Sequence, residues 1–339
     1  MKEYILDKLK DILAIDSPTG YTKEVIDYLQ SEVSSLGFKT YTTQKGNLVV
    51  EIDGSDKSAI AVCAHADTLG LMVRSIKDNG KLSVTLVGGL QMNTVNGEYC
   101  RVYTRDNKVY TGTLLSTTPS SHVYPDAKGV IADDKTIEIR LDEVVNSKED
   151  VLALGINNGD FVAIDPKTEF TKSGYIKSRF LDDKLSVAIL LGIIKKFKGE
   201  KLKRKTYFIF TVYEEVGHGN SYLPQDITEV LGVDMGCIGL DLSCSEHDVS
   251  ICAKDSRGPY DYEMTSKLVS IAKENKLNYA VDIYPFYGSD VSAALSSSND
   301  IKGALVGPGV HASHGLERSH TDAIDATYDL VYKYLMGDK

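Results

Sequence analysis

The chain of 339 residues is long enough for one large domain or two smaller ones, and its composition, 42% hydrophobic and 25% charged, is typical of a folded globular protein. Its formal net charge of -10, from 48 acidic and 38 basic residues, argues against a nucleic-acid-binding protein, because phosphate contacts need clustered Lys and Arg. The longest apolar run, residues 185–194, is much shorter than the roughly 20 residues of a membrane span, so we expect no membrane role.

The N-terminal part of the chain alternates between helical and strand patterns. Apolar residues at helical spacing predict helices over residues 3–15 and 22–36, separated by the breaker SPTG. Short strands are then expected over residues 40–43, 47–52 and 59–65. The last of these, AIAVCAH, is apolar without a break, which is typical of a central strand covered on both faces of a sheet.

The sequence pattern changes between residues 69 and 172, where short segments of alternating apolar and polar residues are separated by Gly, Asn and Asp. Only one helix is expected there, over residues 147–156, with Ser147 and Asp150 as its capping residues. We interpret this region as a small β-rich domain inserted into an α/β domain.

After the insertion, helices again alternate with apolar strands. Helices are expected over 184–197 and 261–276, and strands over 206–213, 237–243, 248–254 and 279–285. The predicted fold is therefore α/β: a doubly wound mixed sheet formed by residues 1–68 and 173–339, interrupted by a β-rich domain at 69–172.

Acidic and imidazole groups gather where the predicted strands end and where one predicted helix begins. In an open α/β sheet, the crevice beyond the carboxyl ends of the strands is the usual ligand site. Five segments of the chain can therefore converge on one place. The residues concerned are His65, Asp67, Asp182, Asp183, Glu214, Glu215, Asp241 and His320.

This set of side chains contains imidazoles and carboxylates but no thiolate, which favours a pair of divalent metal ions such as zinc, cobalt or manganese. Two such ions need a bridging carboxylate and further ligands of their own. Of the adjacent Glu214 and Glu215, one can bind a metal ion while the other acts as a base toward a water that bridges the two ions. Asp67 can orient the His65 ring. The simpler interpretation of Asp182 and Asp183 is a helix cap.

Five sequence segments, in this order, resemble the dinuclear aminopeptidases of peptidase family M42, the TET-type peptidases, which include glutamyl, leucyl and lysyl aminopeptidases. These segments are CAHADTLGLMV, FLDDKLS, TVYEEVG, GLDLS and ERSH. The resemblance continues through LVGG at 86–89, DVLALGINNGDFVAIDP at 150–166 and YGSD at 287–290, so it covers nearly the whole chain. The sequence departs from many members at Thr68-Leu69 and Lys184.

The resemblance implies a role for each residue of the site. It implies Asp182 as the bridging ligand, Glu214 as the general base and Asp67 as the orienting acid. It also implies two divalent ions, with zinc expected and cobalt or manganese as alternatives. The implied metal ligands are His65, Asp182, Glu215, Asp241 and His320. His314, six residues before His320, is the alternative imidazole, and we expect His122, His218, His247 and His311 to be surface or hydrogen-bonded residues.

The implied activity is removal of N-terminal residues from peptides. The resemblance also implies a PDZ-like insertion and a homo-oligomer, a dodecamer built from dimers. Five scattered cysteines without a CxxC pair, and an N-terminus that lacks the apolar segment of a signal peptide, favour the cytoplasm. Two alternatives stay open: a related dinuclear-metal deacylase or carboxypeptidase, and a non-enzymatic, metal-stabilised assembly protein. A spare acid such as Glu214 argues against the second, because a structural metal site needs no base.

Overall fold

The computed structural model describes residues 1–337, and the chain divides into two compact units. Unit 1 comprises Met1–Asp67 and Lys167–Lys339, and unit 2 comprises Thr68–Pro166. Among the described residues, no helix is both long and apolar enough to cross a membrane.

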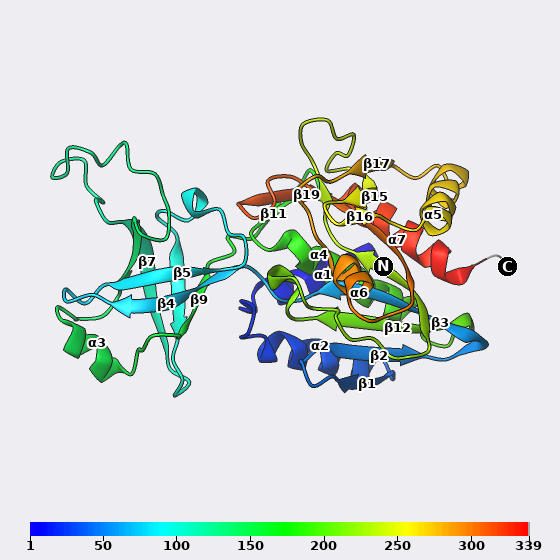
Figure 1. Ribbon diagram of the computed structural model, residues 1–339, viewed down its shortest axis with the longest axis horizontal. Helices are drawn as coiled ribbons and strands as arrows, with labels where there is room; N and C mark the ends of the chain where they lie inside the picture. Colours follow the sequence, from blue (N-terminus) through cyan, green and yellow to red (C-terminus); the bar gives the residue numbers. More distant parts are fainter. Residues whose placement is uncertain (338–339) are drawn as a thin grey trace. The chain divides into compact units, whose positions relative to one another are not determined.

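Unit 1 is an α/β unit (Figure 1). Its helices are α1 (Lys2–Leu13), α2 (Lys23–Ser35), α4 (Leu181–Lys196), the 3-10 turn η2 (Glu214–Val216), α5 (Tyr262–Glu274), α6 (Asp290–Ser296) and α7 (Thr321–Met336). Its strands are β1 (Lys39–Thr42), β2 (Leu48–Ile52), β3 (Gly54–His65), β10 (Glu169–Phe170), β11 (Tyr175–Ser178), β12 (Leu202–Thr211), β13 (Ile227–Val233), β14 (Gly236–Cys237), β15 (Val249–Asp255), β16 (Gly258–Pro259), β17 (Tyr279–Ile283), β18 (Lys302–Val310) and β19 (Glu317–His320).

The main sheet of unit 1 is mixed and has the order β1-β2-β12-β3-β13-β18-β15-β16. Its centre is parallel: β3 pairs with β12 on one side and with β13 on the other, and β13 pairs with β18. The carboxyl ends of these four strands therefore meet at one edge of the sheet. That edge is where an open α/β sheet places its ligand site.

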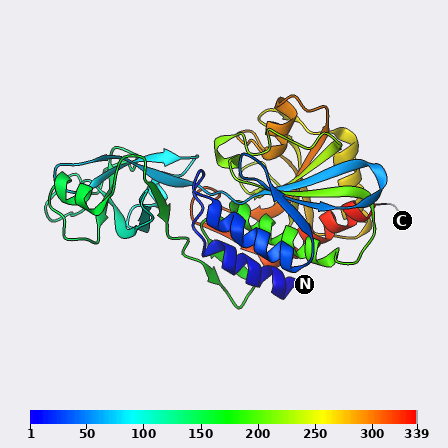
Figure 2. The ribbon, with the colours of Figure 1, turned by 90° about the horizontal axis from the view of Figure 1, so that it is seen from below.

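Helices cover both faces of this sheet. Figure 2 shows α1, α2, α4 and α7 grouped on one face, where α4 contacts both α1 and α7. On the other face α6 packs against the sheet, and Val291 and Ala294 join Ala61 and Cys63 of β3 in one buried apolar cluster. Successive residues of a strand point to opposite faces of the sheet. Because helices cover both faces here, the side chains on both sides of β3 are buried, which explains its unbroken apolar sequence.

Unit 2 contains a closed barrel with the strand order β4-β5-β8-β7-β6-β9. Its helix α3 begins with a capping box between Ser147 and Asp150, as the sequence predicts. The elements of this unit are β4 (Gly70–Ile76), β5 (Leu82–Val87), the 3-10 turn η1 (Met92–Thr94), β6 (Tyr99–Tyr103), β7 (Val109–Ser116), β8 (Ile137–Leu141), α3 (Lys148–Leu154) and β9 (Phe161–Ile164).

One predicted strand is wrong in a way that affects the site. The expected strand over 237–243 forms only β14, Gly236–Cys237, and the residues after it are irregular. The strand that enters the main sheet here is β13, which the sequence pattern does not predict. Its Gly232 obscured the pattern, because glycine weakens a strand. A Cβ at Gly232 would meet Val291 of α6 at 2.6 Å, so the close approach of α6 requires glycine there.

Candidate metal centre

The centre is built around Asp182, which begins α4 next to Asp183, with non-helical backbone angles at both residues. Asp182 Oδ1 lies 3.1 Å from Nε2 of His65, the last residue of β3. The same His65 nitrogen lies 4.0 Å from Oδ1 of Asp234, which directly follows β13. One oxygen of Asp182, one imidazole and one further carboxylate thus face a common point.

The second oxygen of Asp182 faces a different pair of side chains. Asp182 Oδ2 lies 3.5 Å from Nε2 of His314, and the same nitrogen lies 3.7 Å from Oε2 of Glu215. His314 belongs to the segment between β18 and β19, and Glu215 to the turn after β12. Asp182 therefore stands between two sets of potential ligands, one on each carboxylate oxygen.

A buried carboxylate that the sequence pattern does not predict holds this arrangement in place. Glu317, the first residue of β19, is 2% exposed. Its Oε2 accepts the backbone N–H of Asp182 at 3.0 Å, and its Oε1 accepts that of His314, also at 3.0 Å. Glu317 thus connects the backbones that carry the central carboxylate and the second imidazole. Glu317 is the first residue of the ERSH segment, and its place in that segment is the sequence feature that could have identified it.

The structure does not bring two of the predicted ligands to this cluster. Asp241 is exposed and lies in the irregular segment after β14, because the strand expected to end at Asp241 does not form. His320 lies at the other end of β19 from Glu317, and its Nε2–H donates to the carbonyl oxygen of Ser173 at 2.9 Å. Asp234 and His314 lie near His65 and Asp182 instead, at 4.0 Å and 3.5 Å respectively.

Asp67 holds the turn that carries the two glutamates. Its carboxylate accepts the backbone N–H of Glu214 at 3.2 Å, that of Glu215 at 3.4 Å, and the hydroxyl of Thr19 at 2.7 Å. The His65 ring donates from Nδ1 to the main-chain oxygen of Asp67 at 2.9 Å, while the nearest carboxylate oxygen is 3.6 Å away. Asp67 therefore orients the ring mainly through its backbone, and its carboxylate orients the glutamates.

Glu214 faces the same space as the two sets of potential ligands without belonging to either set. Its Oε2 is 3.8 Å from His65 Nε2, and its side chain is 12% exposed. Burial, followed by the charges of neighbouring carboxylates, raises the pKa of Glu214 well above its usual range. A carboxyl group in this position can accept and return a proton near neutral pH.

The cluster contains far more negative than positive groups. Burial raises the pKa of Asp183, Glu215 and Glu317 well above their usual range, and that of Asp234 to about 7. Burial alone would lower the pKa of His65, but the hydrogen bond with Asp182 and the surrounding carboxylates raise it. Buried oxygens of Asp183 and Glu215 have no hydrogen-bond partner within the protein. Such a donor set suits divalent cations, which would supply the missing positive charge.

The stability of protein stripped of metal with EDTA should fall as the pH rises from 5 to 7. The folded-state pKa of Asp234 is about 7, above its unfolded value of 3.8. The protonated carboxyl therefore stabilises the fold at low pH, and this contribution is lost as the pH rises toward 7. The loss from Asp234 alone is up to about 3 kcal/mol. Thermal unfolding at pH 5, 6 and 7, with and without zinc, tests this, and a melting temperature of the stripped protein that rises over this range would contradict it.

Gly307 of β18 is expected to tolerate no side chain, because a Cβ there would lie 1.4 Å from the main-chain oxygen of Asp234. Gly307→Ala should therefore destabilise the protein by about 1–3 kcal/mol or more and displace Asp234 from the cluster, which lowers metal content. Urea unfolding and elemental analysis measure both effects. Gly239→Ala is the matched control, since a Cβ there meets no atom within 4 Å. Equal stability of the two variants would refute this prediction.

Comparisons with known proteins agree with this fold. The family model of M42 glutamyl aminopeptidase matches residues 46–330. YhfE of Bacillus subtilis (strain 168), which is provisionally named an aminopeptidase, is 45% identical over 336 residues, or 98% of this chain and 97% of YhfE.

Two solved structures are similar over almost the full length. The TET1 peptidase of Pyrococcus horikoshii, which can assemble into a tetrahedron or a large octahedral shell, is 25% identical with a TM-score of 0.87, covering 98% of this chain and 100% of that chain. Aminopeptidase APDkam598 from the archaeon Desulfurococcus kamchatkensis has the same fold, with 21% identity and a TM-score of 0.88 over 100% of this chain and 96% of that chain. On the evidence of both sequence and fold, the chain belongs to the M42 glutamyl aminopeptidase family.

Proposed function

We propose that this protein is a metal-dependent aminopeptidase that removes residues one at a time from the N-termini of peptides. Membership of the M42 family makes it a peptidase. The observation that carries the metal dependence is the position of Asp182, whose two oxygens face two separate ligand sets. Two divalent cations bound there would polarise the scissile carbonyl group and lower the pKa of the attacking water.

We assign the ligands from these distances. His65 and Asp234 would hold one ion, His314 and Glu215 the other, and Asp182 would bridge them. Imidazole and carboxylate ligands accept zinc, cobalt and manganese, with zinc expected. Reconstitution of stripped protein with each metal, followed by an activity assay, identifies the one that supports turnover.

Glu214 would act as the general base and then as the general acid. Its carboxylate would take a proton from the attacking water and deliver it to the leaving amine. Its raised pKa suits both steps, and the hydrogen bond from its backbone N–H to Asp67 holds the turn that carries it. Glu215, next to it, points its Oε2 toward His314 instead. The adjacent pair would thus divide base and ligand roles.

A specificity for free N-termini follows from the charge of the site. The cluster is rich in carboxylates, which attract the ammonium group of a peptide N-terminus. Aminoacyl p-nitroanilides should therefore be cleaved, whereas the same compounds with an acetylated amine should not, and a chelator should abolish cleavage. Cleavage of acetylated substrates would favour the deacylase alternative. An absence of hydrolysis with every metal would favour the non-enzymatic assembly protein.

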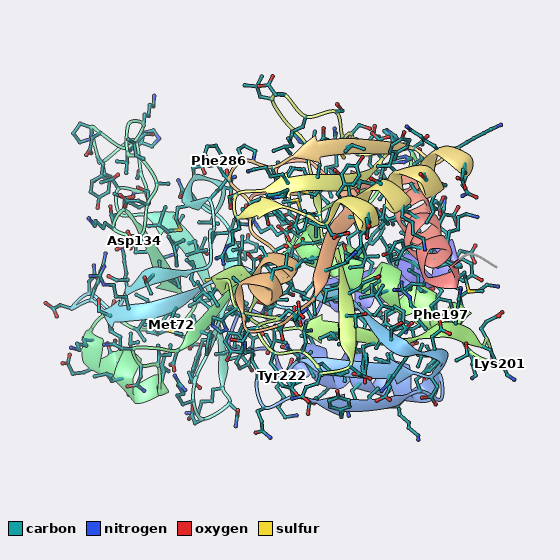
Figure 3. The ribbon with its side chains drawn as sticks, turned by 45° about the vertical axis from the view of Figure 1, so that its right-hand side comes forward. Met72, Asp134, Phe197, Lys201, Tyr222 and Phe286 are labelled. Atoms are coloured by element: carbon teal, nitrogen blue, oxygen red, sulfur yellow. The ribbon has the colours of Figure 1, made fainter. Side chains whose placement is uncertain are left out.

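We also propose that the chain assembles with copies of itself, as dimers that build a dodecamer, with the barrel of unit 2 acting as a PDZ-like domain. The similarity to the assembling TET1 peptidase supports an oligomer. So do large apolar side chains on the surface of unit 1: Phe286, labelled in Figure 3, is 99% exposed and Leu240 is 93% exposed. Mass photometry would show the oligomer directly, and a monomer at micromolar concentration would refute this.

A further inference from the structure

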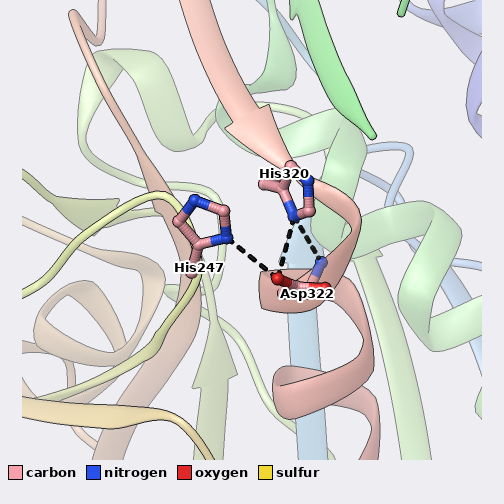
Figure 4. Close-up of side chains that lie close together, drawn as sticks. All are labelled: His247, His320 and Asp322. Carbon is pink, nitrogen blue, oxygen red and sulfur yellow. Dashed lines mark hydrogen bonds and ion pairs between the residues drawn. The ribbon is translucent and has the colours of Figure 1, made fainter. Parts of the chain in front are cut away.

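A second group of potential metal ligands lies outside the centre described above. It consists of His247, His320 and Asp322 (Figure 4). His247 precedes β15, His320 ends β19, and Asp322 lies in the first turn of α7. His320 is three residues along β19 from Glu317, which corresponds to roughly 10 Å of strand. The group is therefore separate from the dinuclear cluster.

The distances within this group suit a single ion. Oδ2 of Asp322 lies 2.9 Å from Nδ1 of His247 and 3.2 Å from Nδ1 of His320. Tetrahedral ligands about 2.0–2.1 Å from a zinc ion are roughly 3.3 Å apart. Only small movements of these side chains would therefore be needed. The ion would replace two existing hydrogen bonds: the one between Nδ1 of His247 and Oδ2 of Asp322, and the one that the backbone N–H of Asp322 donates to Nδ1 of His320.

The outer nitrogens of both imidazoles already have hydrogen-bond partners. Nε2–H of His320 donates to the carbonyl oxygen of Ser173 at 2.9 Å, and Nε2 of His247 lies 3.3 Å from the hydroxyl of Tyr175, which can accept its N–H. The Tyr175 ring also packs edge-on against both imidazoles. Metal-binding histidines have this arrangement, because the outer hydrogen bond fixes the tautomer that presents the other nitrogen to the ion.

We propose that His247, His320 and Asp322 form a mononuclear site for a divalent transition metal such as zinc. Two imidazoles and one carboxylate are ligands that zinc accepts. The side chains of His247 and Asp322 are 40% and 46% exposed, so water can complete the coordination. The ion would join the irregular segment before β15 to the start of α7. His247, expected to be a surface or hydrogen-bonded residue, would then also be a metal ligand.

The number of zinc ions retained per subunit tests this site. Protein stripped with EDTA, reloaded with zinc and desalted should hold one ion fewer in His247→Ala and in Asp322→Asn than in the wild type. His122→Ala, an exposed histidine of unit 2, is the control and should retain the wild-type number. The readout is a difference, so it does not depend on how many ions the dinuclear centre holds.

A second measurement covers weak binding that desalting removes. Zinc should raise the melting temperature of the wild type and of His122→Ala by more than that of His247→Ala, because the ion connects two segments of the fold. Equal zinc content together with an equal zinc-induced shift in the wild type and His247→Ala would overturn the proposal. That result would leave a hydrogen-bonded group that binds no metal ion.

Discussion

Replacing Glu214 with glutamine is expected to lower kcat by a factor of roughly 10²–10⁴ while both metal ions of the dinuclear centre stay bound. Glutamine has nearly the same size and shape but cannot take a proton from water. The turn that carries residue 214 is held by its backbone N–H on Asp67, which the substitution leaves in place. Steady-state kinetics on an aminoacyl p-nitroanilide, together with elemental analysis, measure both quantities.

Glu215→Gln is the matched comparison for this prediction. Because Oε2 of Glu215 faces His314, the variant should lose metal as well as activity. The two neighbouring substitutions therefore differ in metal content, which separates a base from a ligand. Wild-type turnover in Glu214→Gln would remove Glu214 from the role of base.

The second large effect is expected for His314→Ala, which should lose one metal ion of the dinuclear centre and lower kcat/KM by at least about 10²-fold. The lost ion would have supplied several kcal/mol of charge stabilisation in the transition state. The imidazole of His314 lies within 3.7 Å of both Asp182 and Glu215. Elemental analysis and kinetics on the same preparation report the two losses.

His311→Ala is the control for this variant, since His311 is exposed and lies three residues earlier in the same segment. It should keep the metal content and kcat/KM of the wild type. Full metal occupancy and activity in His314→Ala would exclude His314 as a ligand and would return the role to His320.

Much of the fold could be predicted from local sequence patterns. The apolar stripes of α1 and α2, the unbroken β3 and the capped α3 all appear where the sequence places them. The missed β13 has a physical cause: α6 packs so closely on Gly232 that the strand contains a residue disfavoured in strands. That packing is a tertiary contact, which local patterns do not reveal.

The differences between the predicted site and the observed cluster arise because local patterns do not reveal tertiary contacts. The sequence pattern predicts a strand over 237–243 and therefore points to Asp241. The strand that forms is β13, and the carboxylate that directly follows it is Asp234. The choice between the two histidines depends on the loop after β18, where Ala312 and His314 adopt positive φ values. Those backbone conformations turn the loop toward Asp182, and Glu317 holds it there. The spacing of HASHGLERSH does not encode that turn.

The most direct test is the anomalous diffraction of crystals grown with zinc. Two peaks about 3.5–4 Å apart should flank Asp182, one beside His65 and Asp234 and the other beside His314 and Glu215. A single peak that Asp182 does not bridge, or a peak bound by Asp241, would contradict the dinuclear centre.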